Sequence, residues 1–425
     1  MPATASLLDE LAWRGLLHQY TDGVGESLAQ KRTSVYCGFD PTAASLHVGN
    51  LVPVMGLVHL QRAGHRPILL VGGGTGMIGD PSGKASERPL ATPEVVQRNS
   101  ESLHAQLARF LSFEGSAAAT MMNNAEWLLS LGAVEFLRDV GKHFTVNYML
   151  QKESVKGRME AGISFTEFAY MLLQAYDYLQ IHRRTGATLQ VGGSDQWGNI
   201  TAGVELIRRV EGVQAHALTF PLVTNTSGTK FGKTEAGSVW LDPERTSPYK
   251  FYQFWINTDD RDASRYLRLF TLLPREQIEA LEEELRARPA GRQAQQALAR
   301  DVTARVHGAE VTRIVERASR LLFDKELDPA SVDEAVLASL REEIPFAEIA
   351  PPADGAIDAL ELFTAAGLAA SKGAARRLLE QGGLTVNGRR LAAGDRAIPT
   401  DALLPGRHLL LRKGARDYAL VRVRA

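Results

Sequence analysis

Cysteine is almost absent from this sequence, since Cys37 is the single one among 425 residues. One cysteine can neither form an internal disulfide nor supply a cysteine-rich zinc site. No run approaches the roughly 20 consecutive apolar residues that a membrane-spanning helix needs. Residues 1–6 also lack the basic start and apolar stretch of a secretory signal. We therefore expect a cytoplasmic protein that has no membrane contact and no structural metal site.

Charge is unevenly distributed along the chain, although the net charge is only −1. Residues 356–425 carry twelve Lys or Arg against six Asp or Glu, a local charge of +6, and the rest of the chain carries −7. A compact basic segment on an acidic chain is typical of a module that binds a polyanion, although a merely solvated basic face has the same composition. At about 150 residues per domain, the length indicates two or three domains.

Short apolar runs alternate with helical patterns in the first half of the chain. Residues 34–39, 66–71 and 188–191 predict strands, and each run is followed by a Gly-containing turn and a helix-like stretch. This alternation predicts an α/β fold with a parallel sheet covered by helices. Ligands of such sheets bind beyond the carboxyl ends of the strands. The turns after these runs are therefore where we expect a site.

The pattern becomes helical from about residue 245. Residues 345–355, with three prolines and a glycine, predict a linker. Asn387-Gly388 predicts a hairpin turn after a short strand. Helices are predicted over residues 275–288, 292–306, 356–365 and 372–381.

Residues 74–79 match the G-x-G-x-x-G dinucleotide fingerprint, but the match is unconvincing. The fingerprint should open a long helix, whereas Asp80-Pro81-Ser82-Gly83 breaks the chain at once. Asp80 would also place a carboxylate where a pyrophosphate should lie. The segment is compatible with a structural turn or with a site that includes Lys84 and Arg88.

Two other segments suit a nucleoside triphosphate. Residues 40–50 place His47, Gly49 and Asn50 at a helix start, where backbone N–H groups and the helix dipole favour phosphate. Residues 228–234 place Lys230 and Lys233 on a Gly-rich loop, which can bring two ammonium groups to a leaving pyrophosphate. Each has a simpler explanation on its own, a helix cap in the first case and an exposed basic loop in the second.

A polar stripe interrupts the apolar helix predicted at residues 165–179. Tyr170, Gln174 and Asp177 lie at positions i, i+4 and i+7 and share one helix face. Buried polar groups are costly without partners. A stripe facing solvent would normally carry Lys or Glu, so we predict that this stripe meets a ligand or another polar layer.

Together, His47-Val48-Gly49-Asn50 and residues 230–234 (Lys-Phe-Gly-Lys-Thr) resemble the two signatures of class I aminoacyl-tRNA synthetases, in the correct order and separation. Residues 36–42, 79–84 and 192–199 resemble the bacterial type of the tyrosyl-tRNA synthetase family, and the resemblance covers nearly the whole chain. Asn50 stands where the class pattern has His, and Phe231-Gly232 and Thr234 stand where it has Met-Ser and Ser.

The resemblance implies a Rossmann-like doubly wound catalytic domain at 1–222 and a mobile signature loop with a helical anticodon-side domain at 223–325. It further implies a linker at 326–355 and a basic RNA-binding domain at 356–425, similar to the alpha-L motif of a ribosomal protein. It also implies a homodimer whose interface includes residues 141–147. The implied activity is that of a tyrosine–tRNA ligase, which joins L-tyrosine to tRNA(Tyr) with ATP and Mg²⁺.

The resemblance assigns roles to individual residues. Tyr36 and Asp177 would hold the phenolic hydroxyl of tyrosine. The residues expected at its ammonium group are Tyr170, Gln174 and Asp80, with Gln196 near its carboxyl group. The residues expected at the phosphates are Thr42, His47, Lys84, Arg88, Lys230 and Lys233. The residues expected at the rest of the ATP molecule are Asp40, Gly49, Asn50, Gly193 and Asp195. Lys233 is expected to contact both the phosphates and this part of ATP. The residues expected at tRNA follow from the charge and clustering of the basic segment rather than from the resemblance, and they are Lys372, Arg376, Arg377, Arg412, Lys413 and Arg416.

Three alternatives stay open at this point. A tryptophanyl-tRNA synthetase shares the architecture, but it would not need both Tyr36 and Asp177. A non-catalytic RNA-binding derivative of a synthetase would be expected to lose His47 or the signature lysines, and all are present. An unrelated nucleotidyltransferase would lack the loop with Lys230 and Lys233.

Overall fold

The computed structural model describes residues 6–82, 92–159, 162–226, 228, 231–234, 237–323, 332–352 and 355–424. The chain folds into two compact units. Unit 1 combines the chain up to residue 246 with residues 258–306, and unit 2 combines residues 247–257 with the chain from residue 307 onward. Among the described helices, none is both long and apolar enough to cross a membrane.

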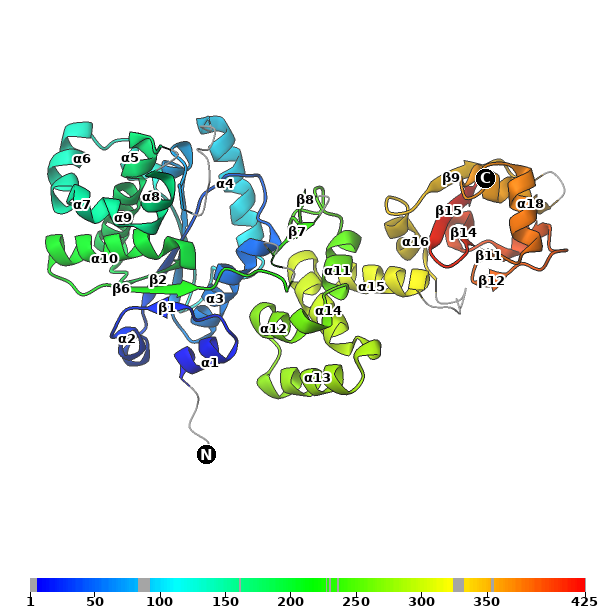
Figure 1. Cartoon of the computed structure of the whole chain (residues 1–425), viewed down its shortest axis with the longest axis horizontal. Helices are drawn as coiled ribbons and strands as arrows, with labels where there is room; N and C mark the ends of the chain where they lie inside the picture. The colour runs from blue at the N-terminus through cyan, green and yellow to red at the C-terminus, as the bar shows by residue number, and fades with distance from the viewer. Residues whose placement is uncertain are drawn as a thin grey trace. The chain divides into compact units, whose positions relative to one another are not determined.

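A six-stranded sheet forms the centre of unit 1 (Figure 1), in the order β1-β6-β5-β2-β3-β4. Neighbouring strands are parallel except β1 and β6. The chain winds from β2 outward to β4 and then resumes on the other side of β2 with β5 and β6. This doubly wound order confirms the predicted α/β fold. The strands are β1 (Gln19–Tyr20), β2 (Ser34–Phe39), β3 (Arg66–Val71), β4 (Thr120–Asn123), β5 (Leu189–Gly193) and β6 (His216–Phe220).

Helices cover both faces of this sheet. On one face α3 packs against β2, β3, β5 and β6, and Gly56 permits this approach because a Cβ there would lie 2.1 Å from the Phe220 ring. On the other face α9 and α10 share a core with Tyr36, Ile68 and Leu70. The helices around the sheet are α1 (Leu7–Trp13), α2 (Val24–Gln30), α3 (Leu51–Arg62), α4 (Pro93–Leu107), α5 (Ala125–Leu128), α6 (Ala133–Asp139), α7 (Val146–Leu150), α8 (Glu153–Met159), α9 (Phe165–Thr185) and α10 (Trp197–Glu211).

Three further helices complete unit 1: α12 (Asp260–Phe270), α13 (Arg275–Ala287) and α14 (Gln293–His307). The last two match the helices predicted from the sequence to within one residue at each end. The buried guanidinium of Arg14 donates to the carbonyl oxygens of Thr271 and Leu273, both at 2.9 Å. This contact ties the chain segment after α1 to the turn between α12 and α13. A short hairpin of β7 (Lys233–Thr234) and β8 (Gly237–Ser238) lies between the sheet and these helices in sequence.

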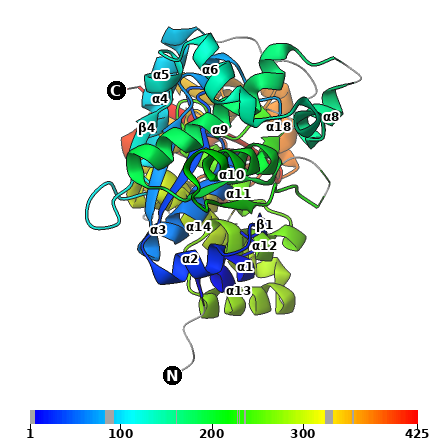
Figure 2. The ribbon, with the colours of Figure 1, turned by 90° about the vertical axis from the view of Figure 1, so that its left-hand side faces the viewer.

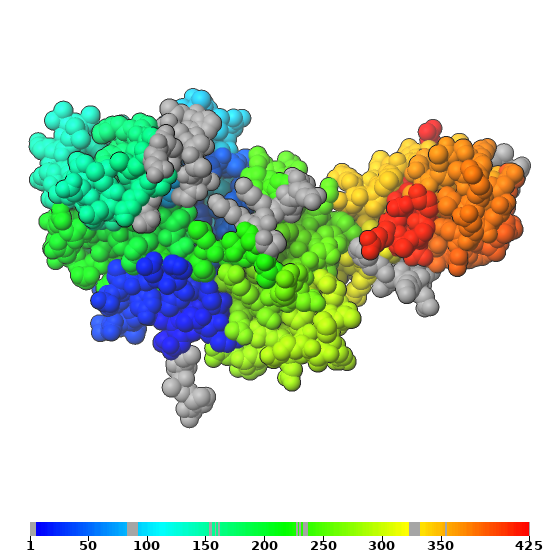
Figure 3. Space-filling model, viewed as in Figure 1, coloured from blue at the N-terminus to red at the C-terminus, as the bar shows by residue number. Residues whose placement is uncertain are grey.

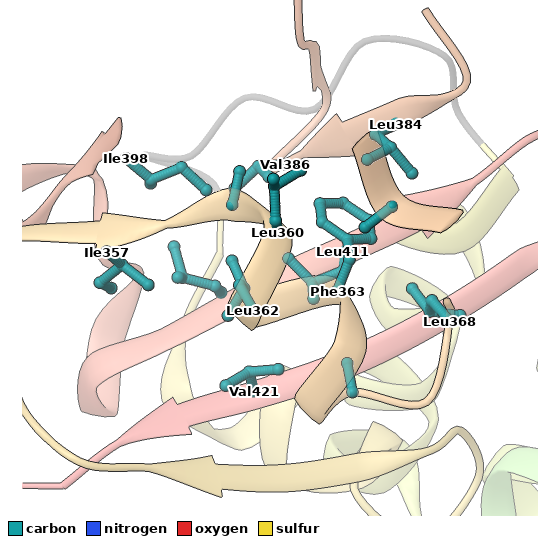
Figure 4. Packing of buried hydrophobic residues seen from close by; sticks show 14 of the residues in the cluster. Ile357, Leu360, Leu362, Phe363, Leu368, Leu384, Val386, Ile398, Leu411 and Val421 are labelled. Carbon is teal, nitrogen blue, oxygen red and sulfur yellow. The ribbon is translucent and has the colours of Figure 1, made fainter. Parts of the chain in front are cut away.

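Unit 2 contains five helices and two sheets among the residues that the structure describes. Its larger sheet has the order β12-β11-β14-β15-β9. Leu360 and Phe363 of α17 pack onto Leu411 and Val421 of this sheet (Figure 4). The helices are α11 (Pro248–Ile256), α15 (Ala309–Phe323), α16 (Glu334–Leu340), α17 (Ala359–Ala365) and α18 (Lys372–Glu380). The strands are β9 (Phe346–Ile349), β10 (Ala356–Asp358), β11 (Leu384–Val386), β12 (Arg389–Arg390), β13 (Ala397–Pro399), β14 (His408–Lys413) and β15 (Asp417–Val423).

The hairpin predicted at Asn387-Gly388 is confirmed. Both residues have positive φ angles, 46° and 79°, and they join the paired residues Val386 and Arg389. These angles fit a two-residue type I′ turn, which asparagine and glycine favour.

Residues 345–355, which we predicted to be part of a linker, contain the strand β9. β9 pairs in parallel with the end of β15, Leu420 opposite Phe346 and Val423 opposite Ile349. The prolines around β9 suggested a linker. Its pairing with a strand about seventy residues later is a long-range contact that no local pattern reveals.

Candidate active site

A cavity of about 520 Å³ opens where the strand order of unit 1 reverses. Its walls come from the carboxyl ends of β2 and β5, from the segments that follow β2, β3 and β5, and from α9. This is the crevice in which doubly wound sheets bind ligands. Thirteen of the predicted site residues line it: Tyr36, Asp40, Thr42, His47, Gly49, Asn50, Asp80, Tyr170, Gln174, Asp177, Gly193, Asp195 and Gln196.

The deep end of the cavity pairs a buried phenol with a buried carboxylate. Tyr36 Oη has no hydrogen-bond partner among the described residues. The neighbouring Tyr178 hydroxyl, by contrast, donates to the carbonyl oxygen of His216 at 2.9 Å. Burial raises the pKa of Asp177 to about 7, opposed by hydrogen bonds to the carboxylate and aided by the charge of Asp40. Polar groups of this kind need a partner when they are withdrawn from water.

Two side chains that the sequence analysis missed hold Asp177 in place. Asn124 Nδ2 donates to Asp177 Oδ2 at 2.9 Å, and Trp127 Nε1 donates to Asp177 Oδ1 at 2.7 Å. Asn124 is itself fixed, because its Oδ1 accepts from the Gly74 N–H at 2.7 Å. Asn124 directly follows β4, and the available signal was this polar residue at the end of a short run containing two methionines. Gln190, a polar residue inside strand β5, was missed as well and also lines the cavity.

The middle of the cavity is acidic. Asp40 accepts from the hydroxyl of Tyr170 and from Thr75 Oγ1, both at 3.0 Å. The Asp80 carboxylate accepts from Gln196 Nε2 at 2.6 Å. Burial raises the pKa of Tyr170 well above its usual value, and the negative charges of Asp40, Asp80 and Asp177 add to the effect. Three carboxylates around one phenol favour a cationic group in this part of the cavity.

The first signature segment forms a 3-10 turn directly before α3, with His47 as its N-cap. His47 Nδ1 accepts from the Gly49 N–H at 3.1 Å, and Asn50 Oδ1 accepts from the His47 N–H at 3.0 Å. The Asn50 side chain therefore caps the turn, which is a structural use for the residue that departs from the class pattern. A Cβ at Gly49 would lie 2.8 Å from the His47 ring, so this tight arrangement requires glycine.

Four predicted phosphate-binding side chains cannot be located. Lys84, Arg88 and Lys230 lie outside the described residues, and Lys233 is described only in its backbone, at the start of β7. Their roles remain predictions. In the part of the chain that is described, no group of three or more His, Cys, Asp or Glu side chains is arranged to hold a metal ion.

The six predicted tRNA-binding residues lie in unit 2. Lys372, Arg376 and Arg377 belong to α18, and Arg412 and Lys413 end β14, with Arg416 in the following turn. Some already have partners: Lys372 pairs with Glu361, Lys413 with Asp417, and Arg412 lies over the Tyr418 ring. Arg376, Arg377 and Arg416 are exposed and form no ion pair with any described residue.

Comparisons with known proteins agree with this architecture. The family model "tRNA synthetases class I (W and Y)" matches residues 28–324, and the model "Tyrosine--tRNA ligase SYY-like C-terminal domain" matches residues 337–421. A tyrosine–tRNA ligase of Anaeromyxobacter dehalogenans is 57% identical over 99% of this chain and 100% of its own length. The corresponding protein of Roseiflexus castenholzii is 52% identical over 98% of this chain and 99% of its own.

Solved structures of similar fold also include tyrosyl-tRNA synthetases. A C-terminally truncated mitochondrial tyrosyl-tRNA synthetase of Aspergillus nidulans matches with a TM-score of 0.68 and 32% identity, covering 76% of this chain and 95% of its own. A tryptophanyl-tRNA synthetase of Encephalitozoon cuniculi matches at 12% identity with a TM-score of 0.53, over 72% of this chain and 87% of its own, which shows the shared fold alone. The chain belongs to the tyrosine–tRNA ligase family of class I aminoacyl-tRNA synthetases.

Proposed function

We propose that this protein activates L-tyrosine with ATP to form tyrosyl-adenylate and pyrophosphate, and then transfers tyrosine to the 3′ end of tRNA(Tyr). One observation carries the choice of tyrosine: Tyr36 Oη, which has no hydrogen-bond partner among the described residues, and the Asp177 carboxylate both line the buried end of the cavity. A substrate hydroxyl placed between them would satisfy both groups. Phenylalanine would leave Tyr36 Oη without a partner and the Asp177 carboxylate with only its two donors Asn124 and Trp127, an effect for which tyrosyl-tRNA synthetases are already an established example.

The ammonium group of tyrosine is proposed to lie among Asp80, Tyr170 and Gln174, with its carboxyl group near Gln196. The acidic surroundings of Tyr170 support this orientation. Gln174 is held by Asn199, whose Nδ2 donates to Gln174 Oε1 at 3.1 Å, and Asp80 is held by Gln196. Side chains fixed in this way can orient the substrate without further rearrangement.

ATP is proposed to bind, as its Mg²⁺ complex, beside the first signature segment. Gly49 and Gly193 leave room for the ribose, and Asp195 can accept from its hydroxyl groups, beside Asp40 and Asn50. Gly193 is suited to this role because even a Cβ there would lie 2.6 Å from Asp195 Oδ1. The side chains proposed for the phosphates are Thr42, His47, Lys84, Arg88, Lys230 and Lys233.

The chemistry requires positioning more than acid–base groups. The tyrosine carboxylate is already an anionic nucleophile, so its attack on the α-phosphorus needs no protein base. The new carboxylate–phosphorus bond forms while the bond to the bridging oxygen breaks, and the electron pair leaves with pyrophosphate. The cationic side chains proposed at the phosphates would stabilise that growing charge. A hydroxyl of the terminal adenosine of tRNA then attacks the tyrosyl carbonyl carbon, and AMP leaves.

The test is pyrophosphate exchange into ATP with each of the common amino acids supplied separately. We expect exchange with tyrosine and little with phenylalanine or tryptophan. Exchange driven by tryptophan would favour a tryptophanyl enzyme, and no exchange with any amino acid would favour a non-catalytic RNA-binding protein. We also propose that the chain acts in the cytoplasm, because its proposed substrates are tRNA and ATP.

We further propose the domain roles expected from the sequence: catalysis in residues 1–222, a signature loop and anticodon-side helices in 223–325, a connecting segment in 326–355 and RNA binding in 356–425. The independent hydrophobic core of the last segment supports its separate role. The exposed Arg376, Arg377 and Arg416 are the strongest candidates for contacts with tRNA phosphates, because they have no competing ion pair among the described residues.

Tyrosine binding is expected to depend on pH through Asp177. Its pKa of about 7 means that the carboxyl group is mostly protonated at pH 6 and mostly ionised at pH 8. A charged acceptor forms a hydrogen bond roughly twice as strong as a neutral one, so tyrosine affinity should increase as the pH rises through 7. The phenols of Tyr36 and Tyr170 do not titrate there, because burial raises the pKa of each well above 10. Equilibrium dialysis from pH 5.5 to 8.5 would measure the trend, and Asp177→Asn should abolish it.

A homodimer is proposed on the basis of an exposed apolar segment. The large side chains of Leu129, Val134, Leu137, Val146 and Phe165 are 59–79% exposed. They lie between α5 and the start of α9, and α5 and α6 lie side by side (Figure 2). This segment reaches the surface in the space-filling view (turquoise in Figure 3), and it includes the predicted interface residues 141–147. Exposed apolar side chains gathered in one region mark interaction surfaces.

Val134→Glu combined with Leu137→Glu is expected to convert a dimer into a monomer, because charges on one face of α6 would have to be buried in the interface. Sedimentation velocity would report the change from twice the chain mass of 46.4 kDa to that mass. Tyr20→Glu is the matched control, since Tyr20 is an exposed apolar residue at the opposite edge of the sheet. If the double variant remained a dimer, this surface would not be the interface.

A further inference from the structure

The second signature packs onto one face of α12 through an aromatic contact. The Phe231 ring is buried and stacks on Phe270, with ring centroids 4.9 Å apart and planes inclined by 15°. Tyr266 meets the same ring edge-on, also at 4.9 Å. Tyr266 and Phe270 lie four residues apart on α12, so they belong to the same helix face. The position that departs from the class pattern therefore has a specific packing site.

Polar contacts join the start of the same loop to the same face of α12. Asp262 Oδ2 accepts from the Thr226 N–H at 3.0 Å and from its hydroxyl at 3.1 Å. Asp262 is one helical turn before Tyr266, so Asp262, Tyr266 and Phe270 form a continuous stripe, which we name the α12 docking face. A buried carboxylate that accepts two hydrogen bonds fixes the loop at Thr226 as the aromatic ring fixes it at Phe231.

The opposite side of the loop contacts the first signature. Gly232 has a φ of +81°, and a Cβ there would lie 2.5 Å from Val48 Cγ2. The Val239 N–H donates to the Gly232 carbonyl oxygen, and the Val48 N–H donates to the Val239 carbonyl oxygen, both at 2.9 Å. Phe231 and Gly232 are thus held between α12 and the start of α3.

We propose that the α12 docking face positions the second signature for adenylate formation, with Phe231 as its positioning residue. The inference rests on the proposed function, in which Lys230 and Lys233 stabilise the leaving pyrophosphate. Phe231 anchors the backbone between the two lysines, which restricts where their ammonium groups can reach. Methionine, which the class pattern has at this position, can fill the same aromatic site because its flexible thioether packs well against aromatic rings.

The alternative is that the Phe231 ring only adds to the stability of α12. In that case its removal would lower the melting temperature and the fraction of protein that reacts, while the rate constant of the folded fraction would stay unchanged. A positioning role instead predicts a slower chemical step with unchanged tyrosine binding, because the contact acts on groups that matter in the transition state.

The test uses the full-length protein and single-turnover formation of tyrosyl-adenylate. Phe231→Ala should lower the rate constant on the order of 10- to 100-fold, the effect expected when charged groups lose their alignment, while the tyrosine dissociation constant changes less than about twofold. Phe231→Met should restore most of the rate. Thr226→Ala is a milder variant at an exposed position, and it should slow the same step without unfolding the protein. Phe113→Ala is the matched control, because Phe113 makes an edge contact with His104 away from the cavity and should not alter the rate.

A double-mutant cycle between Phe231→Ala and Phe270→Ala should show non-additive losses in the rate constant, because both variants remove the same contact. Lys230→Ala serves as the reference for a damaged signature. If Lys230→Ala is slow but Phe231→Ala reacts at the rate of the unsubstituted protein, the positioning role is overturned and the proposed function stands. Equal losses of rate and tyrosine affinity, or no recovery in Phe231→Met, would also overturn it. If the unsubstituted protein shows no tyrosine-dependent exchange, the proposed function itself fails.

Discussion

Replacing Asp177 with alanine is expected to weaken tyrosine activation and to erode the discrimination against phenylalanine. The change removes an acceptor of the substrate hydroxyl, and it also leaves the Asn124 amide and the Trp127 indole N–H without the partner that each has now. A substrate hydroxyl left without this buried acceptor costs about 1–3 kcal/mol, so we expect tyrosine kcat/KM to fall roughly 5- to 150-fold. Activation of phenylalanine should fall much less, because that substrate never used the carboxylate.

Two variants separate recognition from structural damage. Asp177→Asn keeps the size of the side chain and should retain the fold while losing the charged acceptor. Trp127→Phe removes one donor to Asp177 but leaves the carboxylate, so it should have a smaller effect. Steady-state kinetics with both amino acids, at matched folded fraction, measures the outcome. If Asp177→Ala still activates tyrosine normally and excludes phenylalanine, the assignment of this end of the cavity is wrong.

Removing the C-terminal sheet is expected to abolish charging of tRNA while leaving adenylate formation intact. Every described residue that lines the cavity lies at or before Trp240, and the C-terminal sheet has a separate core. The truncated protein should end at Ile344. A cut near Pro351 would leave β9 without its partner β15, and an unpaired exposed strand invites aggregation. Pyrophosphate exchange and aminoacylation, measured on the same preparation, test both halves of the prediction.

Charge reversal tests the binding of tRNA without deleting any part of the fold. Arg376→Glu with Arg377→Glu should weaken tRNA binding and flatten its salt dependence, by roughly one unit of slope for each phosphate that the protein no longer neutralises. Arg62→Glu with Arg66→Glu is the matched control, since both are exposed arginines in unit 1 at the end of α3 and the start of β3. A truncated protein that charges tRNA at the full rate would exclude an essential RNA-binding role. If truncation instead lowers melting temperature and adenylate formation together, the C-terminal segment acts on stability.

Local features of the sequence determined several strands, one hairpin turn and one helix face of this protein. The apolar runs at 34–39 and 66–71 became β2 and β3 with those bounds, because a buried parallel strand needs a continuous apolar segment. Asn387-Gly388 determined its hairpin because these residues accept positive φ angles. The stripe of Tyr170, Gln174 and Asp177 lines the cavity because α9 is a regular helix that holds all three on one face.

Only the tertiary structure decided which distant groups act together. Asn124 and Trp127 hold Asp177 across some fifty residues of sequence, β9 completes a sheet with β15, and Phe231 packs against Tyr266 and Phe270. None of these contacts leaves a periodic trace in the sequence, because each joins elements whose proximity depends on how the whole chain folds. Helix and strand periodicity reports which face of an element is buried, whereas the partner of that face is set by packing between elements that are remote in sequence.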